Sequence, residues 1–374
     1  MSGIYIHIPF CTKRCTYCDF HFSTSFSNYR ERMILSLKEE LSLRKKELTS
    51  PIQSIYFGGG TPSLLHIEEL SLLLEDIYLN YNIGPGVEVT LEANPENITI
   101  NNAKAWKNLG INRLSVGLQS FKDDDLKWMN RGHSTKQNTT CISELYQAGF
   151  ENISVDLIYG LPGLKTLEWE HFLKEVVEMG VEHISAYCLT IEDKTKLKHD
   201  VENDKIKPLS ENKQIAQFEF LCSFLKGKSY EHYEVSNFAL NNKYSKHNRS
   251  YWERKRYLGI GPSAHSFNGK ERRWNVSNNH TYMSRGTNLK NWYNKEELTL
   301  SSVWNELFLT GLRTMWGVSK KEIETLGGFT NQEKKLIKKL IDKGSLFDSG
   351  NAYILSENGL LFADSISESF FRVL

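Results

Sequence analysis

Short runs of β-branched and aromatic residues alternate along the chain with longer amphipathic stretches. The amphipathic stretches, such as "YRERMILSLKEELSLRKKEL", place apolar residues three or four positions apart, as a helix that covers a sheet does. The short runs are typical of β-strands. They lie at residues 3–8, 54–59, 87–93, 112–118, 152–158 and 183–189. Strands alternating with helices predict a parallel sheet with right-handed crossovers. Six such units predict an α/β fold built on a partial, open (β/α)6 barrel of the TIM type.

The pattern changes near residue 298, where helical stretches follow one another without intervening strands. A short hairpin pattern and a last helix come after them, which predicts a small helical, winged-helix-like domain. The expected organisation is therefore a barrel over residues 1–235, a connecting segment over 236–297 and a C-terminal domain over 298–374.

The charge balance does not favour a nucleic-acid partner. Lysine and arginine together number 46 and aspartate and glutamate 45, so no global field attracts polyanions. No stretch reaches the roughly 18 consecutive apolar residues of a membrane span, and the start "MSGIYIHIPF" lacks the build of a signal peptide. We therefore expect a cytoplasmic protein without a transmembrane segment, and contact with a membrane surface stays open.

Three cysteines, Cys11, Cys15 and Cys18, follow the first strand within eight positions. In a reducing cytoplasm they are expected to be ligands, not disulfides. Zinc is one reading, because His21 could complete a Cys3His site. A [4Fe–4S] cluster is the other: one short loop can wrap three corners of a cubane, leaving one iron open for a substrate. The remaining cysteines, Cys141, Cys188 and Cys222, sit singly in apolar runs and are expected to be packing residues.

Polar and glycine-rich positions also follow the other strands. In a β/α barrel the loops after the strand C-termini form one face, where the chemistry is placed. These positions are "GGGTP" after the second strand, Glu92, Gln119, Asp156, Tyr187 and Thr190.

The spacing C-x3-C-x2-C after a first strand, with "GGGTP" after the second, resembles the radical S-adenosylmethionine (SAM) superfamily. That resemblance implies a [4Fe–4S] cluster held by the three cysteines, with SAM on the open iron. "YIHIPFC", "RLSVGLQSF" and "DLIYGLPG" extend the similarity over nearly the entire chain to the anaerobic coproporphyrinogen oxidase family.

The same resemblance implies which residues contact SAM. Tyr5, Gly59 and Glu92 would line the SAM nearest the cluster. Glu92 would accept a hydrogen bond from a ribose hydroxyl of that SAM. The positions that match contacts to a second SAM are Tyr17, Gly60, Thr61, Gln119, Arg131 and Asp156. Structural alternatives stay open: "GGGTP" as a plain turn, Glu92 as a strand-end charge, and Arg131 with Asp156 as a buried ion pair.

Two features separate this chain from the oxidases. The oxidase pattern has a further cysteine two positions after the third ligand, where this chain has Phe20. The oxidases also carry an N-terminal extension before their first strand. In addition, "HNRSYW" (247–252) matches the motif H-N-x-x-Y-W of the related HemW family of haem chaperones.

This motif offers groups suited to haem. A neutral imidazole such as that of His247 is a standard axial ligand, and Tyr251 and Trp252 offer flat faces to a porphyrin. His265, within "YLGIGPSAHSF" on an expected glycine-rich turn, is a weaker candidate ligand. The basic residues that could pair with propionates are Lys246, Arg249, Arg254, Lys255 and Arg256. The alternative is that the motif only anchors its segment on the barrel.

The resulting hypothesis is a haem chaperone that carries a [4Fe–4S] cluster and SAM and passes haem to client proteins. Whether it is also an enzyme is open, because an oxygen-independent coproporphyrinogen-III dehydrogenase, or another radical SAM enzyme, would share the cluster and the barrel. A zinc-stabilised binding module is the minor alternative.

Overall fold

All six expected strands are present in the computed structural model, which describes residues 2–284 and 292–373. They pair in parallel, in chain order, as a single curved sheet. The strands are β1 (Ser2–Ile8), β2 (Ile52–Gly59), β3 (Ile83–Ala93), β4 (Arg113–Gln119), β5 (Ile153–Tyr159) and β6 (His183–Cys188). The predicted parallel α/β core is therefore confirmed. Within the described residues, no helix is long and apolar enough to cross a membrane.

The sheet continues beyond the six strands at both edges, to twelve strands in all. Antiparallel strands β8 and β7 extend it beyond β6. At the other edge β9 pairs with β1 in parallel, and antiparallel strands β10 to β12 follow. The bounds are β7 (Glu231–Glu234), β8 (Asn237–Ala239), β9 (Arg256–Ile260), β10 (His265–Phe267), β11 (Glu271–Asn275) and β12 (Tyr293–Glu297). The segment 236–297 thus supplies five strands of the sheet, and its residues 285–291 lie outside the described residues.

His265 lies on strand β10 and not on the expected glycine-rich turn. The reason is the use of glycine for close packing: a Cβ on Gly259 of β9 would lie 1.9 Å from the carbonyl oxygen of His265. Glycine in a strand often marks such a close approach of two backbones. Gly259, one of the glycines of "YLGIGPSAHSF", is therefore needed for the close contact between β9 and β10.

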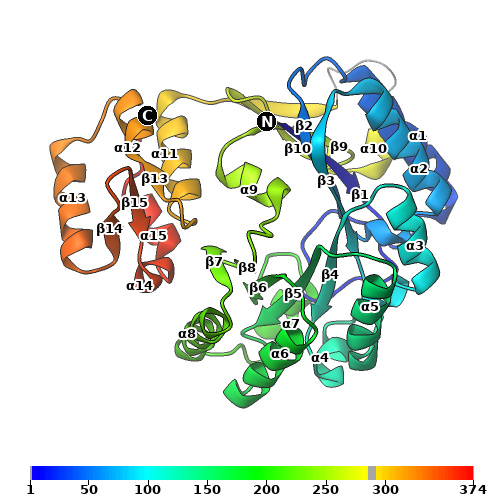
Figure 1. The fold of residues 1–374 in the computed structure, drawn as a ribbon, viewed down its shortest axis with the longest axis horizontal. Helices are drawn as coiled ribbons and strands as arrows, with labels where there is room; N and C mark the ends of the chain where they lie inside the picture. Colours follow the sequence, from blue (N-terminus) through cyan, green and yellow to red (C-terminus); the bar gives the residue numbers. More distant parts are fainter. Residues whose placement is uncertain (1, 285–291, 374) are drawn as a thin grey trace.

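Helices cover the outer, convex side of the parallel sheet (Figure 1). Alternate strand residues such as Ile4, Ile6 and Val89 are buried under these helices. The covering helices are α1 (Arg30–Leu43), α2 (Ile67–Asn80), α3 (Ile100–Asn108), α4 (Asp123–Trp128), α5 (Thr135–Gln147) and α6 (Thr166–Glu178). Three further helices are α7 (Lys196–Glu202), α8 (Glu211–Gly227) and α10 (Asn279–Ser284).

The inner side of the sheet is polar, and a short helix fills part of it. Buried polar side chains on this side include Glu88, Thr90, Arg113 and His183. Helix α9 (Lys246–Trp252), which contains the "HNRSYW" motif, lies inside the curve of the sheet (Figure 1). It contacts β1 and β2 there. The motif is therefore an internal element of the barrel and not a surface loop.

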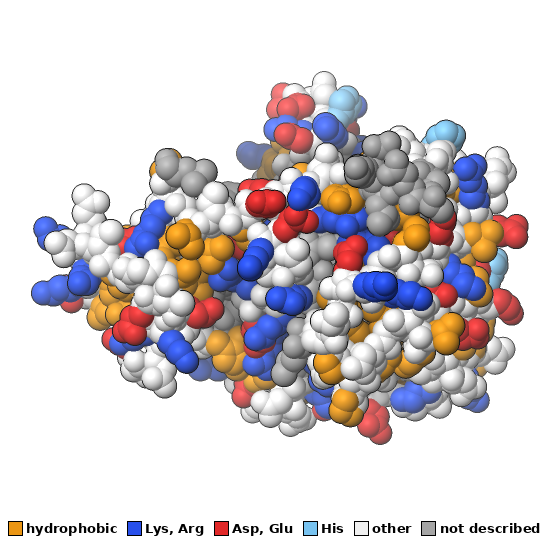
Figure 2. All heavy atoms as spheres, turned by 90° about the horizontal axis from the view of Figure 1, so that it is seen from above, with side chains coloured by type: hydrophobic (Ala, Val, Ile, Leu, Met, Phe, Trp, Pro, Cys, Tyr) orange, Lys and Arg blue, Asp and Glu red, His pale blue; other side chains and the backbone are white. Residues whose placement is uncertain are grey.

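The C-terminal region forms a separate small core beside the barrel, as predicted (Figure 1). Its elements are α11 (Leu300–Gly311), β13 (Val318–Ser319), α12 (Lys320–Thr325), α13 (Asn331–Asp342), β14 (Leu346–Asp348), β15 (Ala352–Leu355), α14 (Glu357–Leu360) and α15 (Ala363–Glu368). A three-stranded sheet in the order β13-β15-β14 packs with these helices. Figure 2 shows basic and acidic side chains interspersed over one face of the molecule, in keeping with the balanced composition.

A buried arginine ties helix α1's C-terminal end to the edge strands. Arg44 is 1% exposed and donates to Glu40 at 2.8 Å, to the carbonyl of Gly259 at 2.7 Å and to Ser266 Oγ at 3.0 Å. Glu47 accepts two further hydrogen bonds from it. A buried charge with this many partners joins the helix to β9 and β10.

Arg44→Met is expected to destabilise the fold by about 3–5 kcal/mol, because it leaves Glu40 buried without its cation. Urea unfolding followed by circular dichroism measures the change. Lys45→Met, at the neighbouring exposed position, is the matched control and should stay within about 0.5 kcal/mol of the parent protein. Equal stability of the two variants would contradict the structural role given to Arg44.

Candidate functional site

The cysteine loop leaves β1 and folds back on itself through backbone hydrogen bonds. Cys11 N–H donates to the carbonyl of Ser23 at 3.1 Å, and Ser23 N–H donates to the carbonyl of Pro9 at 2.9 Å. Cys11, Cys15 and Cys18 are all free thiols at partly exposed positions. The loop thus presents three unpaired sulfurs at the carboxyl end of the first strand, as predicted.

Burial raises the pKa of the Cys11 thiol to about 11, and a hydrogen bond and a positive charge near the sulfur oppose that shift. Thr61 Oγ1 donates to Cys11 Sγ at 3.5 Å, and Arg131 Nη1 donates to Cys15 Sγ at 3.7 Å. Hydrogen bonds and positive charge around sulfur stabilise thiolate ligands and tune the metal they hold. Two residues expected near SAM therefore act on the ligand loop itself.

The described donors are not gathered around one point as a single zinc ion requires. Over residues 2–284 and 292–373, no three histidine, cysteine, aspartate or glutamate side chains lie close enough to share one metal ion. His21, the fourth ligand of the zinc alternative, instead bonds Asn279 through Nε2 at 2.7 Å. A cubane binds each thiolate at a different iron, so it accepts cysteines that are spread apart.

The loop after β2 packs against the cysteine loop through glycine backbone. A Cβ on Gly60 would lie 2.6 Å from the carbonyl oxygen of Phe10 and 3.0 Å from Cys11 Sγ. Gly59 has φ +111°, and a Cβ there would lie 2.7 Å from the His7 ring. Both positions therefore need glycine, which explains "GGGTP" as close packing beside the cysteines and not as a plain turn.

Glu92 stands at the end of β3 with both carboxylate oxygens facing this loop. It accepts the hydroxyl of Tyr56 at 2.8 Å and the N–H of Gly59 at 3.2 Å. Burial, aided by the charge of Asp156, raises the pKa of Glu92 to about 7. The carboxyl group can therefore both accept and donate a hydrogen bond near neutral pH.

Arg131 and Asp156 do not form the direct ion pair that was the structural alternative. Arg131 Nη2 donates to Asn94 Oδ1 at 2.8 Å and to the carbonyl of Gly117 at 2.9 Å, and its buried Nε has no partner within the described chain. Asp156 accepts the Ser115 hydroxyl at 3.4 Å, and burial raises its pKa to about 6. Both side chains thus keep polar capacity for a ligand.

Tyr17 and Gln119 lie in the same neighbourhood. Burial raises the pKa of Tyr17 above its usual value, with the nearby Arg131 guanidinium opposing the shift. Gln119 has φ +67° at an irregularity in the β4–β5 pairing, and its Nε2 lies beside Gly117. A non-glycine residue in this region is uncommon and often marks a functional position.

A cavity of about 620 Å³ joins the cysteine loop to helix α9. Sites for small molecules and cofactors typically have about 300–1,000 Å³. The lining residues expected from the sequence are Tyr5, Gly59, Glu92, Tyr251, Trp252, Arg254 and His265. Three sequence-predicted contacts of SAM (Tyr5, Gly59 and Glu92) thus share a cavity wall with predicted contacts of haem. The other predicted SAM contacts do not line this cavity; they are Tyr17, Gly60, Thr61, Gln119, Arg131 and Asp156.

His247 is not part of that wall. Its imidazole is 1% exposed, with Nδ1 bonded to Ser54 Oγ at 2.8 Å and Nε2 bonded to the Tyr251 hydroxyl at 2.8 Å. The ring also stacks on Tyr56, with centroids 5.0 Å apart. Direct coordination of haem iron by His247 stays a prediction, and it would require one of these hydrogen bonds to break.

The sequence missed part of the cavity wall. Of the five basic residues near the motif, the lining includes Arg254 alone, and Arg272 of β11 supplies a second cation. Arg272 Nη2 donates to Glu306 at 2.7 Å. Thr310 of α11 shows that the C-terminal region also contributes. The sequence signal that could have pointed to Arg272 was the strand-like segment "ERRWN" (271–275). That segment predicts a strand, but it does not predict which residues lie beside the strand in the fold.

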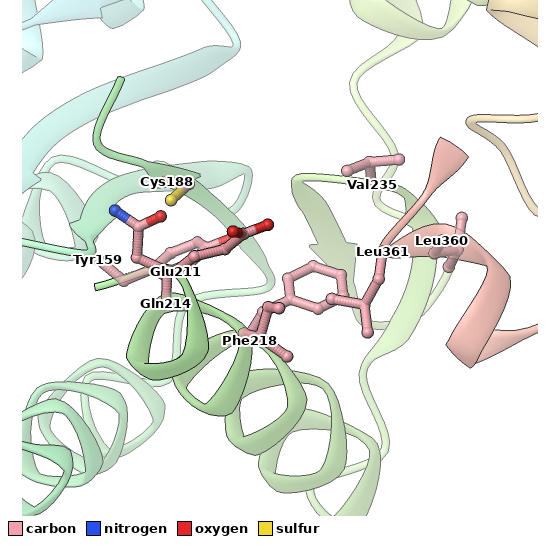
Figure 3. A pocket seen from close by; sticks show the side chains of 9 residues that line it. Tyr159, Cys188, Glu211, Gln214, Phe218, Val235, Leu360 and Leu361 are labelled. Atoms are coloured by element: carbon pink, nitrogen blue, oxygen red, sulfur yellow. The ribbon is translucent and has the colours of Figure 1, made fainter. Parts of the chain in front are cut away.

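A smaller cavity, of about 170 Å³, lies away from the cysteine loop, between helix α8 and the C-terminal region (Figure 3). Phe218 and Leu361 face each other across it, and Cys188 and Gln214 lie at its other end. Its apolar walls contain none of the residues expected to hold a cluster, SAM or haem.

Gly60→Ala is expected to disturb the cysteine loop, since its Cβ would overlap the backbone of Phe10 and touch Cys11 Sγ. After anaerobic reconstitution with iron and sulfide, we expect it to retain less than half of the iron of the parent protein. Gly227→Ala, where a Cβ would meet nothing within 4 Å, is the control and should retain all of it. Full iron retention in Gly60→Ala would show that this contact does not shape the loop.

The chain is similar to known proteins over nearly its full length. Residues 5–176, which include the three cysteines, match the Radical SAM superfamily. A protein named haem chaperone HemW from Bacillus subtilis (strain 168) is 32% identical over 380 residues, covering 99% of both chains. A protein of the same name from Lactococcus lactis subsp. lactis (strain IL1403) is 32% identical over 372 residues, covering 99% of this chain and 97% of its own.

The fold is also that of a solved structure. Coproporphyrinogen III oxidase (HemN) from Escherichia coli superposes with a TM-score of 0.85 and 20% identity, over 100% of this chain and 90% of that one. At this identity the likeness shows the fold alone. The full-length identity to the HemW proteins, together with the match at residues 5–176, establishes the family. The chain belongs to the radical SAM superfamily and, within it, to the HemW family.

Proposed function

We propose that this protein is a haem chaperone of the radical SAM type, which binds haem in the 620 Å³ cavity and passes it to client proteins. The observation that carries the proposal is that one cavity is lined by both sets of predicted contacts. Gly59 and Glu92 are predicted SAM contacts, and Tyr251 and Trp252 belong to the "HNRSYW" helix. The HemW relatives, named as haem chaperones, support the same reading.

The three cysteine donors of the loop fit a [4Fe–4S] cluster. Cys11, Cys15 and Cys18 would hold a [4Fe–4S] cluster, with Thr61 and Arg131 donating to two of the sulfurs. Such a cluster, when bound, supplies an open iron for SAM and one-electron chemistry. The residues that would contact SAM are Tyr5, Tyr17, Gly59, Gly60, Thr61, Glu92, Gln119, Arg131 and Asp156.

The far part of the cavity has the chemistry that haem requires. Trp252 and Tyr257 offer ring faces, and Phe267 adds apolar surface. Arg254 and Arg272 lie on the same wall and both pair with Glu306, at 3.6 Å and 2.7 Å. Two guanidinium groups that share one carboxylate keep donors free for propionates.

The proposed location is the cytoplasm, where a reducing environment keeps the six cysteines as thiols. No nucleic-acid partner is proposed, because the charge is balanced overall. The partners are haem and the client proteins that receive it.

The proposal is tested with the full chain after anaerobic reconstitution with iron and sulfide. We expect saturable haem binding, followed by Soret absorbance, and no turnover of coproporphyrinogen III. Absence of haem binding would refute the chaperone reading. Turnover to protoporphyrinogen would establish the dehydrogenase in its place.

A pair of arginine variants locates the haem. Arg272→Gln removes a cation from the cavity wall, and we expect haem affinity to fall about tenfold, as the loss of a charge-assisted hydrogen bond does. Arg256→Gln, at an exposed position outside the lining, is the matched control and should bind haem as the parent protein does. If Arg256→Gln weakened haem binding as much as Arg272→Gln, haem would bind on the outer surface and not in the cavity.

A further inference from the structure

The "HNRSYW" helix places its tyrosine, and not its histidine, at the cavity. Building on the proposed haem-binding function, we propose that Tyr251 is the axial ligand of ferric haem iron, and that His247 is a positioning residue that accepts the tyrosine proton. Tyrosine is one of the residues that hold haem iron in proteins. The metal-binding residue of the motif is then Tyr251, whereas the sequence alone favours His247.

The geometry of α9 separates the two side chains by one helical turn. Residues four apart lie on the same face of a helix, so the Tyr251 and His247 rings pack edge to face, with centroids 4.9 Å apart. The Tyr251 hydroxyl and His247 Nε2 are 2.8 Å apart. Tyr251 lines the cavity, while His247 lies behind it, away from the lining. A haem in the cavity would meet the tyrosine first.

The imidazole is held too firmly to exchange places with the tyrosine. Ser54 Oγ bonds Nδ1, and Glu88 accepts the backbone N–H groups of Lys246 and His247 at 3.2 Å each, which fixes the start of the helix. A Cβ on Gly3 would lie only 3.1 Å from the imidazole, so strand β1 closes the far side. Moving His247 to the cavity would open this packing, whereas Tyr251 already lines the cavity.

The proton balance of ligation can be written from these groups. With the imidazole proton on Nδ1, Nδ1–H donates to Ser54 Oγ and Nε2 accepts the Tyr251 hydroxyl. When the phenol oxygen bonds Fe(III) and displaces a water molecule, its proton passes to Nε2. The Nδ1 proton passes to Ser54 Oγ, the hydroxyl gives up its original proton, and the hydroxyl then donates to Nδ1. One proton is released to solvent, and the iron stays ferric throughout.

This exchange keeps the imidazole neutral in both states, because the ring gains a proton at Nε2 as it loses one at Nδ1. His247 is 1% exposed, and a charge buried without a partner is costly, so a change of tautomer is favoured over a buried imidazolium.

The test is spectroscopy of the reconstituted full chain loaded with ferric haem at neutral pH. We expect a phenolate-to-iron charge-transfer band and the phenolate vibrations that resonance Raman detects. Tyr251→Phe should lose both and weaken haem binding about tenfold or more. His247→Ala should keep the band but bind haem about tenfold to 100-fold more weakly, as expected when a ligand loses a charge-assisted hydrogen bond. His247→Gln, whose amide can hydrogen bond the phenolate, should recover part of that loss.

Tyr146→Phe removes a phenol hydroxyl on α5, outside the cavity, and is the matched control; it should leave the spectrum unchanged. Iron and sulfide content and circular dichroism confirm that each variant is folded and loaded. Retention of the band in Tyr251→Phe, its loss in Tyr257→Phe alone, or a histidine-type spectrum that His247→Ala abolishes would each overturn the inference. Those outcomes leave the proposed function intact, whereas failure of the parent protein to bind haem would remove the function itself.

Discussion

The parallel pairing of β1 with β2 is the constraint on which the site depends. It sets Ile8 opposite Gly59, so the cysteine loop and the glycine loop leave the sheet side by side. Gly60 N–H then donates to the carbonyl of Ile8 at 2.9 Å, and its α-carbon lies against Phe10 and Cys11 with no room for a side chain. The proposed metal site on one loop and the proposed ligand-binding backbone on the other therefore depend on a single strand register. Parallel pairing also explains why the proposed site lies at the carboxyl-terminal ends of the strands.

The polar interior of the barrel is the second determinant. A closed barrel of eight strands fills its interior with its own side chains, whereas here an open sheet admits helix α9, which contacts β1 and β2 from inside. The hydrogen bonds of His247 to Ser54 and Tyr251 hold that helix in the lumen. The same helix carries Tyr251 and Trp252, two of the aromatic side chains that line the cavity. The "HNRSYW" helix therefore both packs inside the barrel and lines the cavity, so one element serves the fold and the proposed site.

The core of the fold could be predicted from the sequence because its signals are local. Strand runs, helical periodicity and the cysteine spacing each lie within one short segment, and all six parallel strands were predicted correctly. The strands of residues 256–297 were missed because they are short. In addition, "RYLGIG" contains two glycines and "ERRWN" begins with three charged residues. The roles of Arg272 and Thr310 could not be predicted, since they reach the cavity only through the antiparallel extension and the C-terminal helix α11. The burial of His247 was likewise invisible, because it results from α9 entering the lumen.

The central claim is that cluster, SAM and haem share one continuous site. Anomalous diffraction at the iron edge from crystals of the reconstituted, haem-loaded protein tests it most directly. The account predicts one iron centre at Cys11, Cys15 and Cys18 and a second, single iron in the cavity bordered by Tyr251 and Arg272. A haem iron found elsewhere, for example in the smaller cavity beside Phe218 and Leu361, would contradict it.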